Sequence, residues 1–184
     1  MRTDQQRFRR YLDKSEIHDV LLRYARGTDR RDMDMVRSTY FGDAYDDHGD
    51  YKGDVDGLIE WITTRHAAIP QSMHFLGNCL IEFIGDDGAL VETYFSRRRV
   101  ASGDDGAPDK VVHAESLGRY IDRFERRNNE WRVAKRIVVY DAVLTATLLG
   151  ATHNVDWVWG RRDSADALFQ MRSEIANQNE KTPI

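Results

Sequence analysis

The segment from Ile17 to Asp29 constrains the fold of this chain more than any other stretch. Placed on a helix at about 100° per residue, its apolar side chains gather on one face. That face consists of Ile17, Val20, Leu21, Tyr24, Ala25 and Thr28, and the opposite face carries Asp19, Arg23 and Arg26. We therefore predict an amphipathic helix over residues 15–30, with Ser15 as its N-cap, whose apolar face packs against another layer of the protein.

Two residues of this helix are unusual for an inert core helix. Tyr24 brings a phenol hydroxyl into the centre of the apolar face, and Asp29 lies on the flank of that face at the end of the helix. A half-buried carboxylate beside a buried phenol needs partners, because an unpaired polar group in a dry environment is costly. We expect His74 to be the partner of Asp29.

The composition is typical of one globular domain with a hydrophobic core, since the 184 residues are 41% hydrophobic and 32% charged. The net charge of −4 does not indicate a partner such as nucleic acid or an anionic membrane. Cys79 is the single cysteine, which excludes an internal disulfide and a cysteine-based metal site. No apolar run is long enough to cross a bilayer, and the first ten residues lack the apolar segment of a signal peptide, so we expect a cytoplasmic protein.

The first part of the chain is predicted to be helical. Residues 1–13 are charged and are expected to form a short helix or a loosely docked arm. Asp32 is the expected cap of a second, short helix that reaches Phe41, and Asp54 or Asp56 is the expected cap of a third helix.

From Gln71 onward the sequence alternates as strands do. The expected strands are Met73–Ile84, Ala89–Ala101, Lys110–Arg126 and Glu130–Asp141. Their connectors are short and rich in turn formers, and Asn128 with Asn129 suits a tight hairpin. Short connectors make neighbouring strands antiparallel, so we predict a four-stranded meander. Helices followed by a meander give an α+β protein with helices packed on one face of a curved antiparallel sheet.

His74 opens the first of these strands and has the chemistry of a general base. If its side of the strand faces the helix layer, the imidazole reaches Asp29, whose carboxylate favours the protonated form and fixes the tautomer. Tyr24 would then donate a proton or a hydrogen bond to a substrate oxygen. The alternative is a core histidine that a carboxylate satisfies, and the residues alone favour that alternative.

Arg136 lies among apolar residues of the last strand and is a candidate for binding a carbonyl oxygen or developing negative charge. It shares its strand parity with Arg132, whereas Trp131 belongs to the apolar face. A solvated arginine on the outer face is therefore an equal alternative. For Trp131 and Arg136 both to point inward, the strand would need a bulge.

Other polar clusters are weaker candidates. The acidic segment around residues 43–50, with a short strand near Ala44–His48, fits no known metal-loop spacing and is predicted to be a solvated turn. His48 and His113 stay open as residues that face a pocket. Residues 97–99 are three consecutive arginines, which alternate between strand faces and form no single patch. No phosphate loop, serine elbow or nucleic-acid-binding pattern is present.

Three motifs resemble the SnoaL-like branch of the NTF2-like superfamily over residues 14–163. They are R-Y-A-R-G-T-D-R-R-D in the first helix, M-H-F-L-G-N at the first strand, and the run from Gly118 to Arg136. The resemblance implies a cone in which N-terminal helices and a curved antiparallel sheet enclose an apolar pocket. Residues 1–13 would form an N-terminal arm and residues 164–184 a C-terminal helix, from Ser164 to about Asn177, and tail.

Several members of that family, including bile acid 7α-dehydratase, scytalone dehydratase and the lindane dehydrochlorinase, are cofactor-free lyases. By resemblance, Tyr24, Asp29 and His74 occupy the positions of the family's catalytic Tyr, Asp and His, and Arg136 resembles a final-strand arginine of the dehydrochlorinase. The implied function is a cofactor-independent lyase acting by β-elimination on a hydrophobic cyclic molecule, with no metal. The alternatives are a steroid- or polyketide-type isomerase or cyclase, and a non-catalytic binding protein or dioxygenase small-subunit-like protein. The family also suggests a homodimer or homotrimer, with Trp157 and Trp159 as contact residues.

Overall fold

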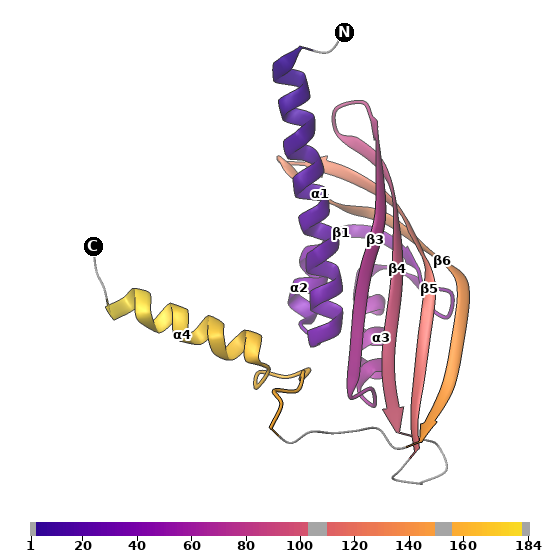
Figure 1. Ribbon diagram of the computed structural model, residues 1–184. Coiled ribbons are helices and arrows are strands. Elements are labelled where there is room, and N and C mark those ends of the chain that lie inside the picture. Colours follow the sequence, from indigo (N-terminus) through magenta and orange to yellow (C-terminus); the bar gives the residue numbers. More distant parts are fainter. Residues whose placement is uncertain (1–2, 103–109, 150–155, 182–184) are drawn as a thin grey trace.

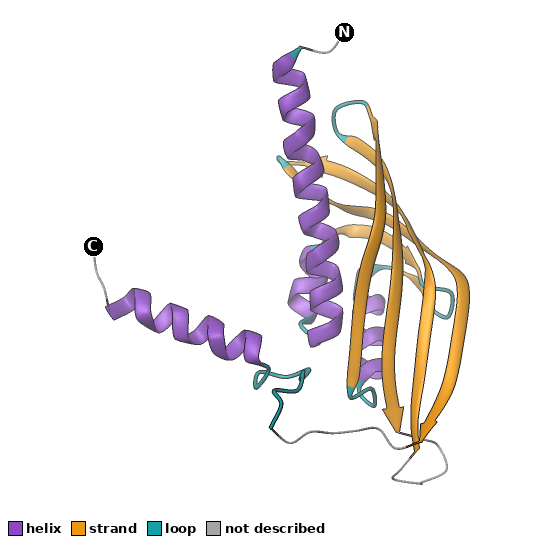
Figure 2. Cartoon of the chain, in the orientation of Figure 1, coloured by secondary structure: helices purple, strands orange, loops and turns teal. Residues whose placement is uncertain are grey.

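A computed structural model describes residues 3–102, 110–149 and 156–181 and has an α+β fold (Figures 1 and 2). Three helices lie on one face of a curved sheet, which bends around them. The elements in chain order are α1 (Asp4–Arg30), α2 (Met33–Ser38), β1 (Tyr40–Asp47), β2 (Lys52–Gly53), α3 (Val55–His66), β3 (Gln71–Ile84), β4 (Gly88–Ser102), β5 (Lys110–Arg127), β6 (Glu130–Leu149) and α4 (Ala167–Lys181). The predicted fold class is confirmed.

The helix α1 is longer than its sequence pattern suggested. It begins at Asp4, where Thr3 and Gln6 form a capping box, so the prediction that Ser15 caps it was wrong. The first half of α1 is anchored by Asp13, whose buried carboxylate accepts hydrogen bonds from Trp131 Nε1 and Arg126 Nη1, both at 3.0 Å. Arg126 lies on β5 and Trp131 on β6, both more than 100 residues further along the chain. Asp13 therefore fixes the first half of α1 to the sheet.

The predicted apolar face of α1 is confirmed. All six of its residues are buried, whereas Asp19, Arg23 and Arg26 are exposed. Helix α3 also begins where expected, with Asp54 as its N-cap. Helix α2 ends at Ser38, so the prediction that it reaches Phe41 was wrong, since Tyr40 and Phe41 begin the strand β1.

The sheet has six strands rather than four, in the order β2-β1-β6-β5-β4-β3. The predicted antiparallel meander β3–β6 forms its larger part, and Asn128 and Asn129 both adopt positive φ at the β5–β6 turn. Strand β1 adds to the free edge of β6 in parallel orientation. A parallel neighbour requires a long connection, here the chain from β1 through α3 and the meander, and no local sequence pattern reports it.

A β-bulge changes which side chains of β6 point inward. Phe124 pairs with Val133 and Arg123 with Lys135, so Ala134 is the extra residue. Trp131 and Val133 face the core before the bulge, and Arg136 faces it afterwards. The bulge that an inward Arg136 required is therefore present, and the alternative of a solvated arginine on the outer face was wrong.

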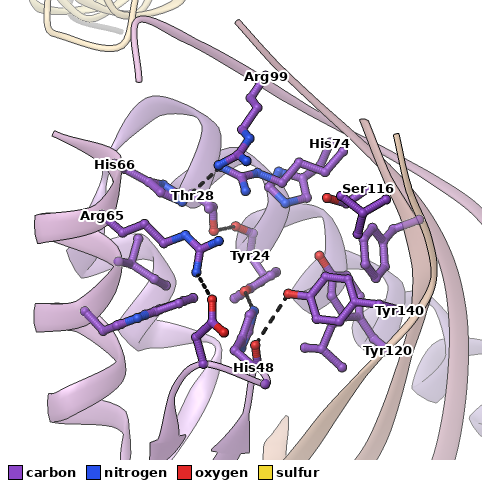
Figure 3. A pocket seen from close by; sticks show the side chains of 18 residues that line it. Tyr24, Thr28, His48, Arg65, His66, His74, Arg99, Ser116, Tyr120 and Tyr140 are labelled. Carbon is purple, nitrogen blue, oxygen red and sulfur yellow. Dashed lines mark hydrogen bonds and ion pairs between the residues drawn. The ribbon is translucent and has the colours of Figure 1, made fainter. Parts of the chain in front are cut away.

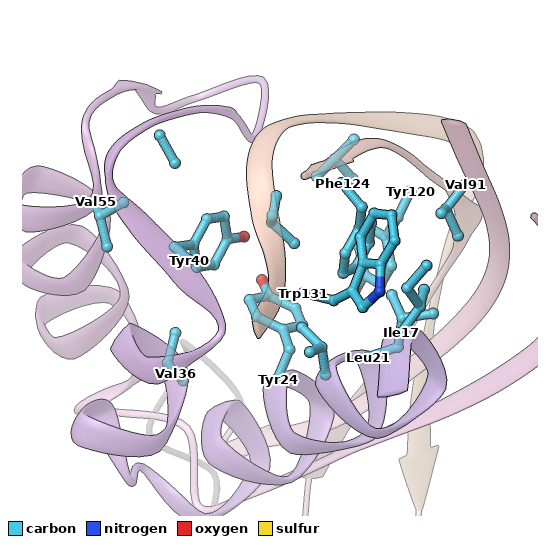
Figure 4. Packing of buried hydrophobic residues seen from close by; sticks show 14 of the residues in the cluster. Ile17, Leu21, Tyr24, Val36, Tyr40, Val55, Val91, Tyr120, Phe124 and Trp131 are labelled. Carbon is cyan, nitrogen blue, oxygen red and sulfur yellow. The ribbon is translucent and has the colours of Figure 1, made fainter. Parts of the chain in front are cut away.

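The core lies between α1 and the inner face of the sheet (Figure 4). Tyr24 lies at its centre, between Tyr40 of β1 and a group of β-strand residues that includes Tyr120, Phe124 and Trp131. Tyr24 makes edge-on ring contacts with Tyr40 and Tyr120 at 6.0 and 5.7 Å between centroids. Burial of these large rings positions the floor of the functional site.

The segment before α4 returns to the end of α1. Arg162 donates to the backbone oxygens of Thr28, Asp29 and Ile69, each at 2.8 Å, so it joins the end of α1 to the segment that follows α3. Helix α4 itself extends away from the sheet (Figure 1). The division of the chain into residues 1–13, 14–163 and 164–184 stays a prediction, although α1 runs without a break through its first boundary. Among the described residues, no helix is long and apolar enough to span a membrane.

Gly27 allows α1 and α2 to approach each other, which leads to a prediction about stability. A Cβ at position 27 would lie 2.8 Å from Val36 Cγ2 and 3.0 Å from the Asp32 carbonyl oxygen. Gly27→Ala should therefore lower the free energy of unfolding by about 1–2 kcal/mol in urea titrations, because overpacking outweighs the gain in helix propensity. Gly42→Ala, where a Cβ meets nothing within 4 Å, is the control. Equal stability of the two variants would contradict this account.

Candidate functional site

A pocket of 370 Å³ opens between the helices and the inner face of the sheet (Figure 3). Each layer contributes to it: Tyr24 and Thr28 come from α1, four residues come from α3, and the strands β3–β6 supply most of the remainder. Trp61, Ile62, Phe95, Val138 and Val143 form apolar walls. Three histidines, three arginines and three tyrosines also line it, so the lining is mixed rather than the apolar one that the resemblance implied.

His74 and Asp29 meet as predicted. The His74 Nδ1 lies 2.7 Å from Asp29 Oδ1, and the backbone N–H of His74 donates to Asp29 Oδ2 at 2.8 Å. Both oxygens of the Asp29 carboxylate thus accept hydrogen bonds from His74. With the Nδ1–H donating a hydrogen bond to the carboxylate, Nε2 keeps its lone pair, and the ring points into the pocket (Figure 3).

The protonation state of His74 differs from the sequence-based expectation. Burial lowers the pKa of the His74 imidazole, and this effect outweighs the opposing effects of the hydrogen bond and charge of Asp29. Asp29 does favour the protonated form, as expected, but the expectation left out desolvation, which lowers the pKa of His74 overall. His74 is a neutral imidazole at pH 7, which is the form that can accept a proton.

A second Asp–His pair lies on the opposite side of Tyr24. His48 Nδ1 contacts the carboxylate of Asp46, and His48 Nε2 lies 3.1 Å from the Tyr24 hydroxyl. Asp46 is fully buried and also accepts a hydrogen bond of 2.7 Å from the Tyr40 hydroxyl. The prediction of a solvated turn was wrong here. The available signal was the alternation of Ala44, Asp46 and His48 on one side of a strand.

Arg136 is buried behind the pocket rather than in it. Its Nε and Nη2 donate to the two carboxylate oxygens of Asp122 at 2.7 and 2.6 Å, and neither side chain is exposed. Although burial opposes the charge, the Asp122 carboxylate raises the pKa of Arg136. Its guanidinium carbon lies 4.2 Å from the ring centroids of both Tyr24 and Tyr120. The structure therefore does not bring Arg136 to a substrate, but makes it a support for Tyr24.

Burial raises the pKa of the Tyr24 phenol, although the neighbouring Arg136 opposes the shift. Tyr24 therefore keeps its proton at neutral pH. With His48 as its hydrogen-bond partner, it can exchange that proton with the imidazole rather than with bulk water.

The remaining candidates lie elsewhere. His113 is half-buried and is not among the residues that line the pocket. Trp157 and Trp159 stack on each other with ring centroids 5.9 Å apart, and their role in subunit contact stays a prediction. In the part of the chain that the structure describes, no group of three or more His, Cys, Asp or Glu side chains is arranged to hold a metal ion.

His66, which sequence reasoning did not single out as a site residue, is buried between two guanidinium groups. Its Nε2 lies 3.0 Å from Arg97 Nη2, and its Nδ1 lies 3.2 Å from Arg162 Nη2. A neutral imidazole has one acceptor nitrogen, so only one of these contacts is a hydrogen bond. We assign it to Arg97, because Arg162 already donates to three carbonyls. Burial, with Arg97 and Arg162, lowers the pKa of His66 to about 2.

Comparisons with known proteins identify the family of this chain and agree with its fold. A family model described as the SnoaL-like domain matches residues 9–137. The uncharacterized protein Rv2910c of Mycobacterium tuberculosis is 26% identical over 128 residues, which cover 68% of this chain and 83% of that protein.

Solved structures with low identity share the fold. A hexachlorocyclohexane dehydrochlorinase, LinA type 2, superimposes with a TM-score of 0.70 at 15% identity, over 80% of this chain and 98% of the other. A proposed scytalone dehydratase of Novosphingobium aromaticivorans superimposes with a TM-score of 0.66 at 11% identity, over 82% of this chain and 98% of the other. The curved sheet and its helices therefore form an NTF2-like cone.

The buried His66 predicts how stability depends on pH. In the folded state His66 stays unprotonated, whereas in the unfolded chain it binds a proton below about pH 6.5. The folded state is therefore destabilised relative to the unfolded chain as the pH falls below that value, and this loss is absent above it. Between pH 7.5 and 5.5 the wild type should lose about 1.4 kcal/mol more free energy of unfolding than His66→Gln. Urea titrations at several pH values measure the difference. The exposed His18→Gln is the control, and parallel curves for wild type and His66→Gln would contradict the assignment.

Proposed function

Because the chain belongs to the SnoaL-like domain family, we propose that its pocket catalyses a cofactor-independent β-elimination, such as a dehydration, on a hydrophobic cyclic small molecule. The observation that carries this proposal is the Asp29–His74 pair, in which a neutral imidazole presents a free nitrogen to a pocket of 370 Å³. Two structural neighbours are named as a dehydrochlorinase and a proposed dehydratase, which supports an elimination.

In the proposed reaction, His74 Nε2 removes a proton from a carbon next to the one that bears a hydroxyl. The electron pair of the C–H bond forms the new double bond, and the C–O bond breaks with its electrons on oxygen. Asp29 stabilises the imidazolium that forms and prevents the ring from rotating, since it also holds the backbone N–H of His74.

The departing oxygen needs a proton, and the Asp46–His48–Tyr24 chain can supply it. Tyr24 gives its hydroxyl proton to the oxygen, which leaves as water, while a protonated His48 returns a proton from Nε2 to the phenol oxygen. Asp46 keeps its contact with His48 Nδ1 throughout. The two Asp–His pairs thus take opposite roles, His74 as base and His48 as proton donor through Tyr24. A proton passed back from His74 to His48 through water restores the starting state.

The mechanism predicts large losses of rate when the base or its carboxylate is changed. His74→Ala removes the proton acceptor, and Asp29→Asn removes the charge that stabilises the imidazolium. Each should lower the rate of dehydration by at least about a hundredfold. The assay is loss of one water, measured by mass spectrometry, on a panel of bicyclic β-hydroxy ketones such as 3-hydroxy-1-tetralone.

Arg98→Gln is the matched control for these variants, because Arg98 is exposed and pairs with Glu115 away from the pocket. It should keep the wild-type rate. Full activity of both His74→Ala and Asp29→Asn would refute the mechanism.

An isomerase or cyclase reaction is the second candidate, because it uses the same residues. A double-bond shift needs His74 to remove and return a proton, and Tyr24 to donate a hydrogen bond to a carbonyl oxygen. The mass of the product separates the two reactions, since dehydration loses one water and isomerisation does not. We expect the loss of water. A product with the mass of the substrate and a shifted double bond would establish the isomerase instead.

A further inference from the structure

Three guanidinium groups gather on one side of the pocket. Arg65 comes from α3, and Arg97 and Arg99 come from β4 (Figure 3 labels Arg65 and Arg99). Consecutive arginines of a strand point to opposite faces, and Arg98 accordingly points outward to Glu115. The expectation that residues 97–99 alternate between strand faces is therefore confirmed. The cluster in the pocket consists of Arg97 and Arg99 from one face of β4 together with Arg65 from α3.

The charge of this cluster is not balanced by the residues around it. Asp50 is the single carboxylate among the residues that line the pocket, and it pairs with Arg65 at 2.6 Å. Arg97 donates to neutral partners only, the hydroxyl of Ser72 at 3.2 Å and His66 Nε2. Among the described residues, no carboxylate forms an ion pair with Arg97 or Arg99. Burial and the neighbouring Arg99 lower the pKa of Arg97, which reflects the same lack of a counter-charge.

Asp29 and Asp46 lie beside two histidines of the pocket, but among the described residues neither forms an ion pair with any of the three arginines. Each carboxylate is bound to the ring of a histidine, at His74 and His48, and neither is among the residues that line the pocket. The protein as a whole carries a net charge of −4, yet the pocket wall carries three arginines against one carboxylate. A cationic pocket in an acidic protein is a feature of the site rather than of the composition.

The cluster lies next to the proposed base. His74 and Arg97 are directly paired across β3 and β4, and Ser72 and Arg99 form the second pair after them. The side chains of His74, Arg97 and Arg99 all line the pocket, so the two guanidinium groups of β4 lie beside His74 on the same face of the sheet. The apolar walls, Trp61, Ile62, Phe95, Val138 and Val143, surround the rest of the space.

From this arrangement we propose that the ligand of the pocket is an apolar ring compound that carries a carboxylate, with the carboxylate bound by Arg97, Arg99 and Arg65. Guanidinium groups bind carboxylates through paired, charge-assisted hydrogen bonds, which are strong where water is excluded. The anion then fixes the ring so that one of its C–H bonds faces His74 Nε2. This inference rests on the proposed function for the reaction, but the binding of the carboxylate is independent of turnover.

Calorimetric titration with two probes of the same shape tests the proposal. 2-Naphthoate carries the carboxylate, and 2-naphthamide is its neutral counterpart. The wild type should bind naphthoate at least about tenfold more tightly than the amide, since a hydrogen bond to a charged group is worth this much or more. Arg99→Gln and Arg65→Gln should each reduce that preference by about tenfold and leave the affinity for the amide unchanged.

Arg98→Gln is the matched control, because it removes the same charge from the neighbouring position on the outer face. It should keep the preference for naphthoate. Equal binding of the two probes by the wild type would overturn the proposal, as would an equal loss in Arg98→Gln and Arg99→Gln, or the failure of both probes to bind. Circular dichroism checks that each variant is folded.

His74→Asn separates this inference from the proposed reaction. This variant lacks the base but keeps all three arginines, so it should lose dehydration activity and keep the preference for naphthoate. If the preference is absent while His74→Asn still abolishes turnover, the carboxylate site fails and the reaction stands. If the preference is present while His74→Asn retains full activity, the reaction fails and the carboxylate site stands.

Discussion

The carboxylate of Asp29 joins the end of α1 to the beginning of β3, and the geometry of the pocket depends on this join. One oxygen accepts the backbone N–H of His74 and the other accepts its ring N–H. The first bond sets the strand against the helix, and the second sets the tautomer of the ring. Arg162 holds the carbonyls of Thr28 and Asp29 from the other side. A helix end, a strand and the segment before α4 therefore converge on a single acidic residue.

Several aspartates are buried in the interior, and each of them has a specific partner. Asp122 binds Arg136 through two hydrogen bonds, Asp46 contacts His48, and Asp13 binds Arg126. Burying ions without partners costs several kcal/mol, whereas pairs with good geometry recover most of that cost. Arg136 also lies against the rings of Tyr24 and Tyr120, so that the position of the Tyr24 phenol depends on a charge that never reaches the pocket.

Periodicity was sufficient to predict the part of the site that lies on α1, because a helix has one repeat and Tyr24 and Asp29 follow it. It also predicted that His74 begins a strand. It could not place Arg136, since the bulge at Ala134 shifts the strand's inner face by one residue. It missed Asp46 because an acidic run is usually solvated, and it missed the anchoring role of Asp13 because Trp131 is distant in the chain. The positions of Arg136, Asp46 and Asp13 depend on strand pairings and polar partners that only the folded structure brings together. A local sequence pattern does not contain that information.

The central claim is that His74 is a neutral imidazole whose Nδ1–H donates a hydrogen bond to Asp29 and whose Nε2 is free. Nitrogen-15 NMR of the histidine rings at pH 7 measures this directly, because it distinguishes the two neutral tautomers and the imidazolium. The account predicts the Nδ1–H tautomer for His74 and its loss in Asp29→Asn. An Nε2–H tautomer or a charged ring in the wild type would contradict the account, since neither leaves a nitrogen in the pocket that can accept a proton.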